Sequence, residues 1–198
     1  MNSRFFLIST LAIVCLVGCT RQGIKPPKGS SETFTLSASK RVELALEVKD
    51  RPVNLSKKDF AFIETNKGNF VIELYSKDSP ATVSNFIRLA KAGFYDGLIW
   101  HRYVEGFVIQ GGDPTGTGRG NPGYTIDFEV NSKTHEKGAV GMARGPDLNS
   151  GSCQFYVCLE SQNQLDGAYC VFGIVTSGMD VVEMLRAEDS ILRITVEK

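Results

Sequence analysis

Polar and apolar side chains alternate over residues 100–114, WHRYVEGFVIQGGDP, and the polar ones are the first groups in the chain that could do chemistry. The alternation predicts two short strands, at about 98–103 and 107–111, joined by a Glu-Gly turn. Successive side chains on a strand face opposite ways, so Arg102 and His101 would point in opposite directions. A permanently charged guanidinium on so apolar a strand must be paired, solvated in a cleft or directed at a ligand.

The same run resembles the signature of the cyclophilin family of peptidyl-prolyl isomerases, which reads roughly F-H-R-x-x-x-G-F-x-x-Q-G-G-D. The matching positions are His101, Arg102, Gly106, Phe107, Gln110, Gly111, Gly112 and Asp113, with Trp100 where the family usually has Phe. Eight matches at fixed spacing are hard to reach by chance, so the resemblance is specific.

A second block, MARGPDLNSGSCQFYV, resembles a later signature of that family, in which Met-Ala is followed by a loop and then by Ser-Gln-Phe-Phe. The matching positions are Met142, Ala143, Asn149, Gln154 and Phe155, while Cys153 replaces the usual Ser and Tyr156 the usual Phe. Leu-Asp-Gly at 165–167 and Val-Phe-Gly at 171–173 also match. The resemblance covers residues 59–198 and says nothing about residues 1–58.

The resemblance implies an enzyme that speeds rotation about X–Pro peptide bonds. This rotation has a barrier of about 20 kcal/mol because amide resonance is lost, so its catalysis needs no nucleophile, metal or cofactor. It needs an apolar pocket for the proline ring and a positioned donor that favours the twisted amide. Arg102 is the expected donor, because it stays protonated and offers several N–H groups.

The implied site has a catalytic set and a substrate-binding set. The first is Arg102, Phe107 and Gln110, and the second is Val108, Gly116, Ala143, Arg144, Gln154, Tyr156, Leu165 and Tyr169. Without the motif, Phe107 and Tyr156 would be interpreted as core aromatics, and the two glutamines as ordinary strand residues. The chain has Gln164 and Tyr169 where many eukaryotic members carry Trp and His, which puts tight binding of the drug cyclosporin in doubt.

Other polar features are given structural interpretations. His101 faces away from Arg102 and is interpreted as a satisfied structural histidine, while His135, in the polar segment 133–137, is expected to be solvated. A G-x-G-x-x-G match at 118–123 is rejected as a dinucleotide site, because its proline and the residues after it do not open a helix.

The first nineteen residues predict an export signal. A positive start is followed by a largely apolar stretch of thirteen residues, too short to span a bilayer, which takes about 20. Leu-Val-Gly-Cys at 16–19 resembles a bacterial lipobox, so residues 1–18 would be a lipoprotein signal peptide and Cys19 the lipidated residue. The alternative is an ordinary secretory signal with an incidental cysteine. We expect a membrane-anchored lipoprotein of the cell envelope, on the periplasmic side of the outer membrane in a Gram-negative host.

Residues 19–58 are predicted to be a lipid-anchored tether, with one or two added strands between Thr33 and Val48. From residue 59, the pattern predicts about eight strands, a helix opened by Ser79 and Pro80, and a second helix over 178–187. The expected fold class is mainly β, a closed eight-stranded antiparallel β-barrel capped by two α-helices, as in cyclophilins.

The cysteines and the charge restrict the partners. Cys153, Cys158 and Cys170 are interpreted as buried thiols, with a Cys158–Cys170 disulfide as the alternative, and no zinc spacing is present. The 22 basic and 22 acidic residues balance, so no nucleic-acid partner is indicated. The expected partners are proline-containing peptides and unfolded proteins, with the membrane through the lipid, and the expected state is a monomer.

Three functional hypotheses remain open at the level of the sequence. The first is a lipid-anchored prolyl isomerase that assists protein folding in the cell envelope. The second is a module that binds Pro-containing segments without turning them over, and the third is a surface lipoprotein whose interactions matter more than catalysis. An intact Arg102 favours the first, because a pure binder could lose it.

Overall fold

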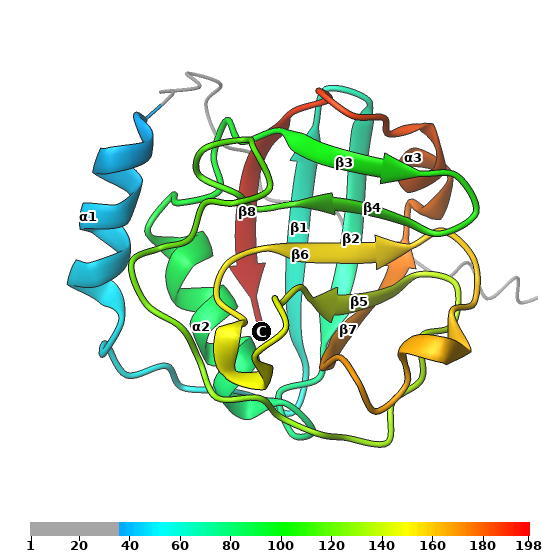
Figure 1. The fold of residues 1–198 in the computed structure, drawn as a ribbon, viewed down its shortest axis with the longest axis horizontal. Helices are drawn as coiled ribbons and strands as arrows, with labels where there is room; N and C mark the ends of the chain where they lie inside the picture. Colours follow the sequence, from blue (N-terminus) through cyan, green and yellow to red (C-terminus); the bar gives the residue numbers. More distant parts are fainter. Residues whose placement is uncertain (1–35) are drawn as a thin grey trace, which may run out of the picture.

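The structure is a computed structural model that describes residues 36–198, drawn in Figure 1. The predicted signal peptide, Cys19 and the first part of the tether lie outside the described residues. The described helices and strands are α1 (Ala38–Val48), β1 (Asp59–Thr65), β2 (Gly68–Leu74), α2 (Pro80–Lys91), β3 (Trp100–Val104), β4 (Val108–Gly111), β5 (Ala139–Met142), β6 (Phe155–Cys158), β7 (Val171–Ser177), α3 (Met179–Met184) and β8 (Ile191–Glu197). Two short 3₁₀ helices, Leu148–Ser150 and Asn163–Leu165, lie in the loops.

The strands form one antiparallel sheet in the order β3-β4-β6-β5-β7-β2-β1-β8, so the predicted mainly β fold is confirmed. The sheet is a strongly curled half-barrel and not the closed barrel we expected. Its edge strands β3 and β8 form no ladder with each other, and their starts are joined by an isolated bridge between Ile99 and Ser190 and by the backbone hydrogen bonds on either side of it. β8 begins only at Ile191, and Glu188, three residues earlier, has a left-handed φ of 73°, so the segment turns there after bonding to Trp100 and does not follow the rest of β3.

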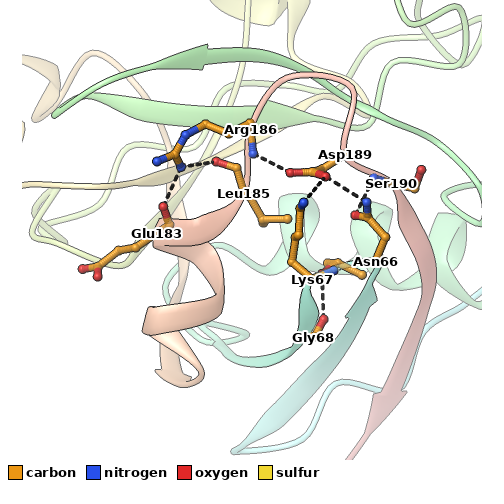
Figure 2. A network of polar contacts seen from close by, with 9 residues as sticks. Asn66, Lys67, Gly68, Glu183, Leu185, Arg186, Asp189 and Ser190 are labelled. Atoms are coloured by element: carbon orange, nitrogen blue, oxygen red, sulfur yellow. Dashed lines mark hydrogen bonds and ion pairs between the residues drawn. The ribbon is translucent and has the colours of Figure 1, made fainter.

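A polar network joins the β1–β2 turn to the segment before β8, beside the open edge of the sheet (Figure 2). The Asp189 carboxylate accepts hydrogen bonds from Asn66 Nδ2 at 2.8 Å and from the Arg186 N–H at 2.7 Å, and Lys67 Nζ lies 3.5 Å away. Asn66 Oδ1 in turn accepts from the Ser190 N–H at 2.9 Å. Burial opposes ionisation of Asp189, but these donors outweigh it and hold its pKa below the ordinary value.

Strands were predicted between Thr33 and Val48, but the described part of this stretch, residues 36–48, contains helix α1 instead. The apolar residues of this stretch alternate, which favoured strands, but the buried stripe consists of Arg41, Ala45 and Val48 at helical spacing. The Ser37 hydroxyl accepts the Lys40 N–H at 3.3 Å and caps the helix. A prediction based on apolar residues alone misses a stripe whose first member is an arginine.

Arg41 fixes α1 to the rest of the domain, and α1 packs on α2 (Figure 1). The Arg41 side chain is only 1% exposed and donates to the carbonyl oxygens of Phe94, of Asp96 at 2.6 Å and of Leu36 at 3.2 Å. Burial lowers its pKa, but three carbonyl partners satisfy its donors. Residues before the predicted domain boundary are therefore packed against the domain.

Helix α2 begins at Pro80, as predicted, and ends before Gly93, which has the left-handed conformation at φ 72°. Ser79 precedes it but makes no capping bond, and its hydroxyl donates to the Val171 carbonyl. The Glu129 carboxylate caps the helix instead, accepting the backbone N–H groups of its second and third residues at 2.9 and 2.7 Å. Helix α3 is shorter than the predicted second helix.

The three cysteines of the described chain are free and buried, so the buried-thiol interpretation is confirmed and a Cys158–Cys170 disulfide is wrong. Burial raises the pKa of Cys153 and of Cys158 to about 12 each, and also raises that of Cys170. Within residues 36–198, the helices are too short or too polar to cross a membrane, and no His, Cys, Asp and Glu side chains cluster as a metal site would require.

Candidate active site

Register places three predicted site residues in one row across neighbouring strands. Arg102 on β3 pairs with Gln110 on β4, and Gln110 pairs with Tyr156 on β6. The row continues to Gly141 on β5, where an added Cβ would lie 2.2 Å from Tyr156 Cζ. Because directly paired residues share a face of the sheet, these side chains converge although they are far apart in sequence. Gly141 leaves the space that the Tyr156 ring occupies.

A bulge directs Arg102 outward. Residues two apart on a regular strand share a face, yet Trp100 is fully buried in the core while Arg102 is exposed. The β3–β4 register shifts between these two residues, so His101 is the extra residue. His101 is half-buried, and its burial lowers its pKa. His101 lines neither of the two adjoining pockets that contain most of the predicted site residues.

The outer face of β4, β5 and β6 carries a pocket of about 260 Å³, which we call the apolar pocket. It is lined by nine of the eleven predicted site residues, namely Arg102, Phe107, Val108, Gln110, Ala143, Arg144, Tyr156, Leu165 and Tyr169. Val108 and Tyr156 belong to a second apolar cluster, on the opposite face of the sheet from the main core. The pocket walls therefore rest on a packed base and do not depend on loops alone.

A second pocket of about 270 Å³, the polar pocket, adjoins the first and shares Gln110, Ala143 and Arg144 with it. Gln154 lies here, together with Gly118, Arg119, Gly120, Asn121, Gly145, Ser150 and Ser152. We call the two pockets together the groove. Gly116 lines neither pocket, because its position faces Ile99, and Gln164 also lies outside both.

A chain of hydrogen bonds connects the two pockets. Arg102 Nη1 donates to Gln110 Oε1 at 3.4 Å, and Gln110 Nε2 donates to Gln154 Oε1 at 2.9 Å. Gln154 Nε2 ends the chain on the carbonyl oxygens of Gly120 at 2.8 Å and Gly118 at 3.2 Å. Each amide has one orientation, and Arg102 keeps most of its N–H groups available. The exposed guanidinium also lies 5.6 Å from the centre of the Phe107 ring.

His135 is fully buried behind the apolar pocket, so the prediction that it is solvated is wrong. Its Nε2 lies 2.9 Å from the Tyr156 hydroxyl, and Nδ1 lies 2.8 Å from Asp166 Oδ1. Asp166 also accepts the His135 backbone N–H at 2.7 Å, and these bonds lower the pKa of its carboxyl. Burial raises the pKa of Tyr156. The sequence showed only a histidine in a polar segment, because its partners lie on distant segments.

Arg144 stands where the two pockets meet and is held firmly. Its Nε and Nη2 donate to the Ala168 carbonyl at 3.0 and 2.8 Å, and Nη1 donates to the Gly145 carbonyl at 2.9 Å. The guanidinium carbon lies 4.7 Å from the centre of the Tyr169 ring and 5.7 Å from that of Phe128. These partners are neutral, so the positive charge of Arg144 remains uncompensated in the groove.

Comparison with known proteins identifies the family. The profile described as "Cyclophilin type peptidyl-prolyl cis-trans isomerase/CLD" matches residues 60–196. The chain belongs to this family. A peptidyl-prolyl cis-trans isomerase of Helicobacter pylori is 45% identical over 149 residues, which cover 73% of this chain and 90% of that protein. Peptidyl-prolyl cis-trans isomerase B of Bacillus subtilis is 47% identical over 140 residues, covering 70% and 96% of the two chains.

A solved structure supports the same conclusion for this cyclophilin. The crystal structure of a Cryptosporidium parvum cyclophilin-type isomerase superposes with a TM-score of 0.67 at 30% identity, covering 71% of this chain and 98% of that one. This cyclophilin is therefore a peptidyl-prolyl cis-trans isomerase. Cyclophilins bind proline-containing peptides and proteins, which gives the substrate class. α1 lies before the residues that the family profile matches.

Proposed function

We propose that this cyclophilin is a lipid-anchored isomerase that assists protein folding in the cell envelope, with Arg102 as its catalytic donor. The observation that carries the catalytic assignment is the position of Arg102 on the apolar pocket. Its guanidinium lies beside Gln110 and over Phe107, where a bound proline ring would place its own peptide bond within reach.

The pocket and the donor perform different parts of the reaction. Phe107, Tyr156 and Leu165 offer apolar surface to the proline ring and remove water from around the bond, which strengthens electrostatic interactions there. As the amide twists, its nitrogen becomes pyramidal and gains a lone pair that can accept a hydrogen bond. Arg102 supplies that bond only to the twisted state, so it lowers the barrier without tightening ground-state binding.

Gln110 acts on this donor and not on the bond itself. Its Oε1 accepts from Arg102, and its own Nε2 is fixed by Gln154, so the amide cannot rotate without losing a hydrogen bond. Arg102 is exposed and would otherwise sample many rotamers. We assign Gln110 and Gln154 the role of positioning Arg102 and the peptide backbone.

The catalytic assignment is tested on the full-length chain in detergent, by following cis-to-trans conversion of a Pro-containing tetrapeptide at low temperature. Loss of a donor worth about 3–4 kcal/mol predicts that Arg102→Ala lowers kcat/KM by about two to three orders of magnitude. Lys91→Gln, which removes an exposed positive charge on α2, serves as the matched control. Equal rates for wild type and Arg102→Ala would favour a binding module and sink the assignment.

The anchoring is supported by the sequence pattern at residues 1–19 and needs its own experiment. Cells expressing the full chain with Cys19 or with Cys19→Ser are labelled with a radioactive fatty acid and fractionated. We expect label and membrane association for wild type, and loss of both for the variant. Label in neither chain would contradict lipidation, and protease treatment of whole cells would report whether the domain faces outward.

A further inference from the structure

The charged residues that line the groove are all positive. Arg102 lines the apolar pocket, Arg119 lines the polar pocket, and Arg144 lines both. Neither pocket is lined by an Asp or Glu residue. The whole chain has equal numbers of basic and acidic residues, so this groove differs from the average surface. Uncompensated charge in a cleft raises the local concentration of ligands of the opposite sign.

The two arginines of the polar pocket present their charge differently. Arg144 is half-buried, stacked on Tyr169 and bonded to two neutral carbonyls, so its cation is fixed in place before any ligand arrives. Arg119 is exposed on the loop that borders the groove. A fixed guanidinium loses little conformational freedom on binding an anion, whereas an exposed one contributes less.

One carboxylate lies beneath the polar pocket, but its oxygens already accept hydrogen bonds from the neighbouring loop. Asp113 is fully buried and accepts from the Thr115 N–H at 2.7 Å, the Thr115 hydroxyl at 2.8 Å and the Gly120 N–H at 3.2 Å. It holds the loop that carries Arg119. It forms no ion pair with Arg119 or Arg144, so both cations remain available to a ligand.

We infer that this cyclophilin prefers substrates with an acidic side chain close to the proline, bound in the polar pocket by Arg144 and Arg119. The inference rests on the proposed function in one respect, that the apolar pocket takes the proline ring. The two pockets share three lining residues, so a peptide in the first runs directly into the second. Because the pockets adjoin, the acidic side chain lies only a few residues from the proline.

The test uses the full-length chain and pairs of peptides that differ only in Glu or Gln, placed at each of about three positions on either side of the proline. Cis-to-trans conversion gives kcat/KM, and fluorescence anisotropy of labelled peptides gives Kd. At about 20 mM salt we expect one position at which the Glu peptide exceeds its Gln partner about fivefold in kcat/KM. The ratio should fall towards one at about 0.5 M salt, where the Debye length is short.

Variants assign the preference to the two arginines. Arg144→Gln should reduce the Glu/Gln ratio the most, because its guanidinium is fixed, and Arg119→Gln should reduce it by a smaller factor. Arg144→Lys keeps the charge without the planar fork and should retain part of the ratio. Lys91→Gln changes the net charge equally but lies on α2 away from both pockets, and it should leave the ratio unchanged.

The outcomes separate this inference from the proposed function. The acidic preference is overturned if the Glu/Gln ratio of kcat/KM stays below about two at every position, or if Lys91→Gln lowers that ratio as much as Arg144→Gln does. Conversion of the Gln peptides would still support an isomerase in either case. If no peptide is converted, the catalytic proposal fails, and the anisotropy ratios still decide whether the groove selects acidic segments.

Discussion

Two polar clusters lie at separate places on the same curled sheet, and they differ in how fully their hydrogen-bonding groups are used. The Asn66 amide and the Lys67 ammonium both contact the Asp189 carboxylate, and Asp189 is only 8% exposed (Figure 2). In the groove, Arg102 is exposed and makes one long hydrogen bond, to Gln110. Groups satisfied within the protein stabilise the fold, whereas groups left available can recognise a ligand.

The largest expected effect on stability tests the Asp189 cluster. Asp189→Ala leaves the Asn66 amide and the Arg186 N–H without their acceptor, so we expect the free energy of unfolding to fall by about 2–3 kcal/mol. Urea denaturation measures this loss. Asp50→Ala, which removes a carboxylate with 86% side-chain exposure, is the control and should cost less than about 0.5 kcal/mol. Similar losses in both variants would show that the network adds no stability.

The second prediction concerns the groove, where we expect a substitution to lower activity and to change stability little. Gln110→Ala removes the acceptor that orients Arg102 and leaves Gln154 without its donor, at a half-buried position. We expect kcat/KM to fall about 10- to 100-fold, which is about 1.4–2.7 kcal/mol, while the free energy of unfolding changes by less than about 1 kcal/mol. A stability loss as large as that of Asp189→Ala, with kcat/KM unchanged, would remove the distinction between the clusters.

These two clusters also show what the sequence could predict. Local signals were sufficient where neighbours in sequence act together, as in the His-Arg run of β3 or the Pro80 start of α2. They failed where a buried polar group is satisfied by a distant segment. Arg41 in α1 bonds to carbonyls 53 and 55 residues away, and His135 bonds to Asp166, 31 residues away. No local pattern indicates such partners.

The sequence indicated which candidate residues lie together, but not the buried groups behind them. Nine of eleven proposed residues line the apolar pocket because a family motif fixes their spacing, and Gln154 lies next to it. Gly116 was placed by its loop alone and faces Ile99 instead. The alternation of apolar residues along the strands does not indicate that the sheet is open, because the turn at Glu188 before β8 follows from backbone conformation.

A third prediction concerns the chain from Tyr156 to Asp166, which is satisfied internally yet borders the pocket. Tyr156→Phe removes the hydroxyl bonded to His135, and we expect kcat/KM to fall about three- to tenfold, with the ring still in place. In the wild-type background, His135→Gln should lower kcat/KM by a similar factor. In the Tyr156→Phe background, His135→Gln should add little, because its link to the pocket is already gone. Additive losses in this double-mutant cycle would assign His135 a purely structural role.

The smallest expected effect is a pH dependence. The pKa of Asp189 is lower in the folded chain than its ordinary value of about 4, so the unfolded state binds the proton more readily. Stability from this group is therefore complete above about pH 5 and is lost as pH falls through the folded pKa. Asp189→Asn should flatten that part of the stability curve, as measured by urea midpoints between about pH 5 and 2. An unchanged acid slope would contradict this account.

The three buried thiols can report how often the segments around them open. Cys153 lies just before β6, the strand that carries Tyr156, and Cys158 ends that strand; both are fully buried, with a pKa raised to about 12. Cys170 lies against Ser79, next to the start of α2. A thiol reagent attacks only an accessible thiolate, so each cysteine reacts when its own segment opens. The labelling times of the three cysteines would therefore compare how often β6, beneath the apolar pocket, and the start of α2 open locally. No probe would have to be introduced.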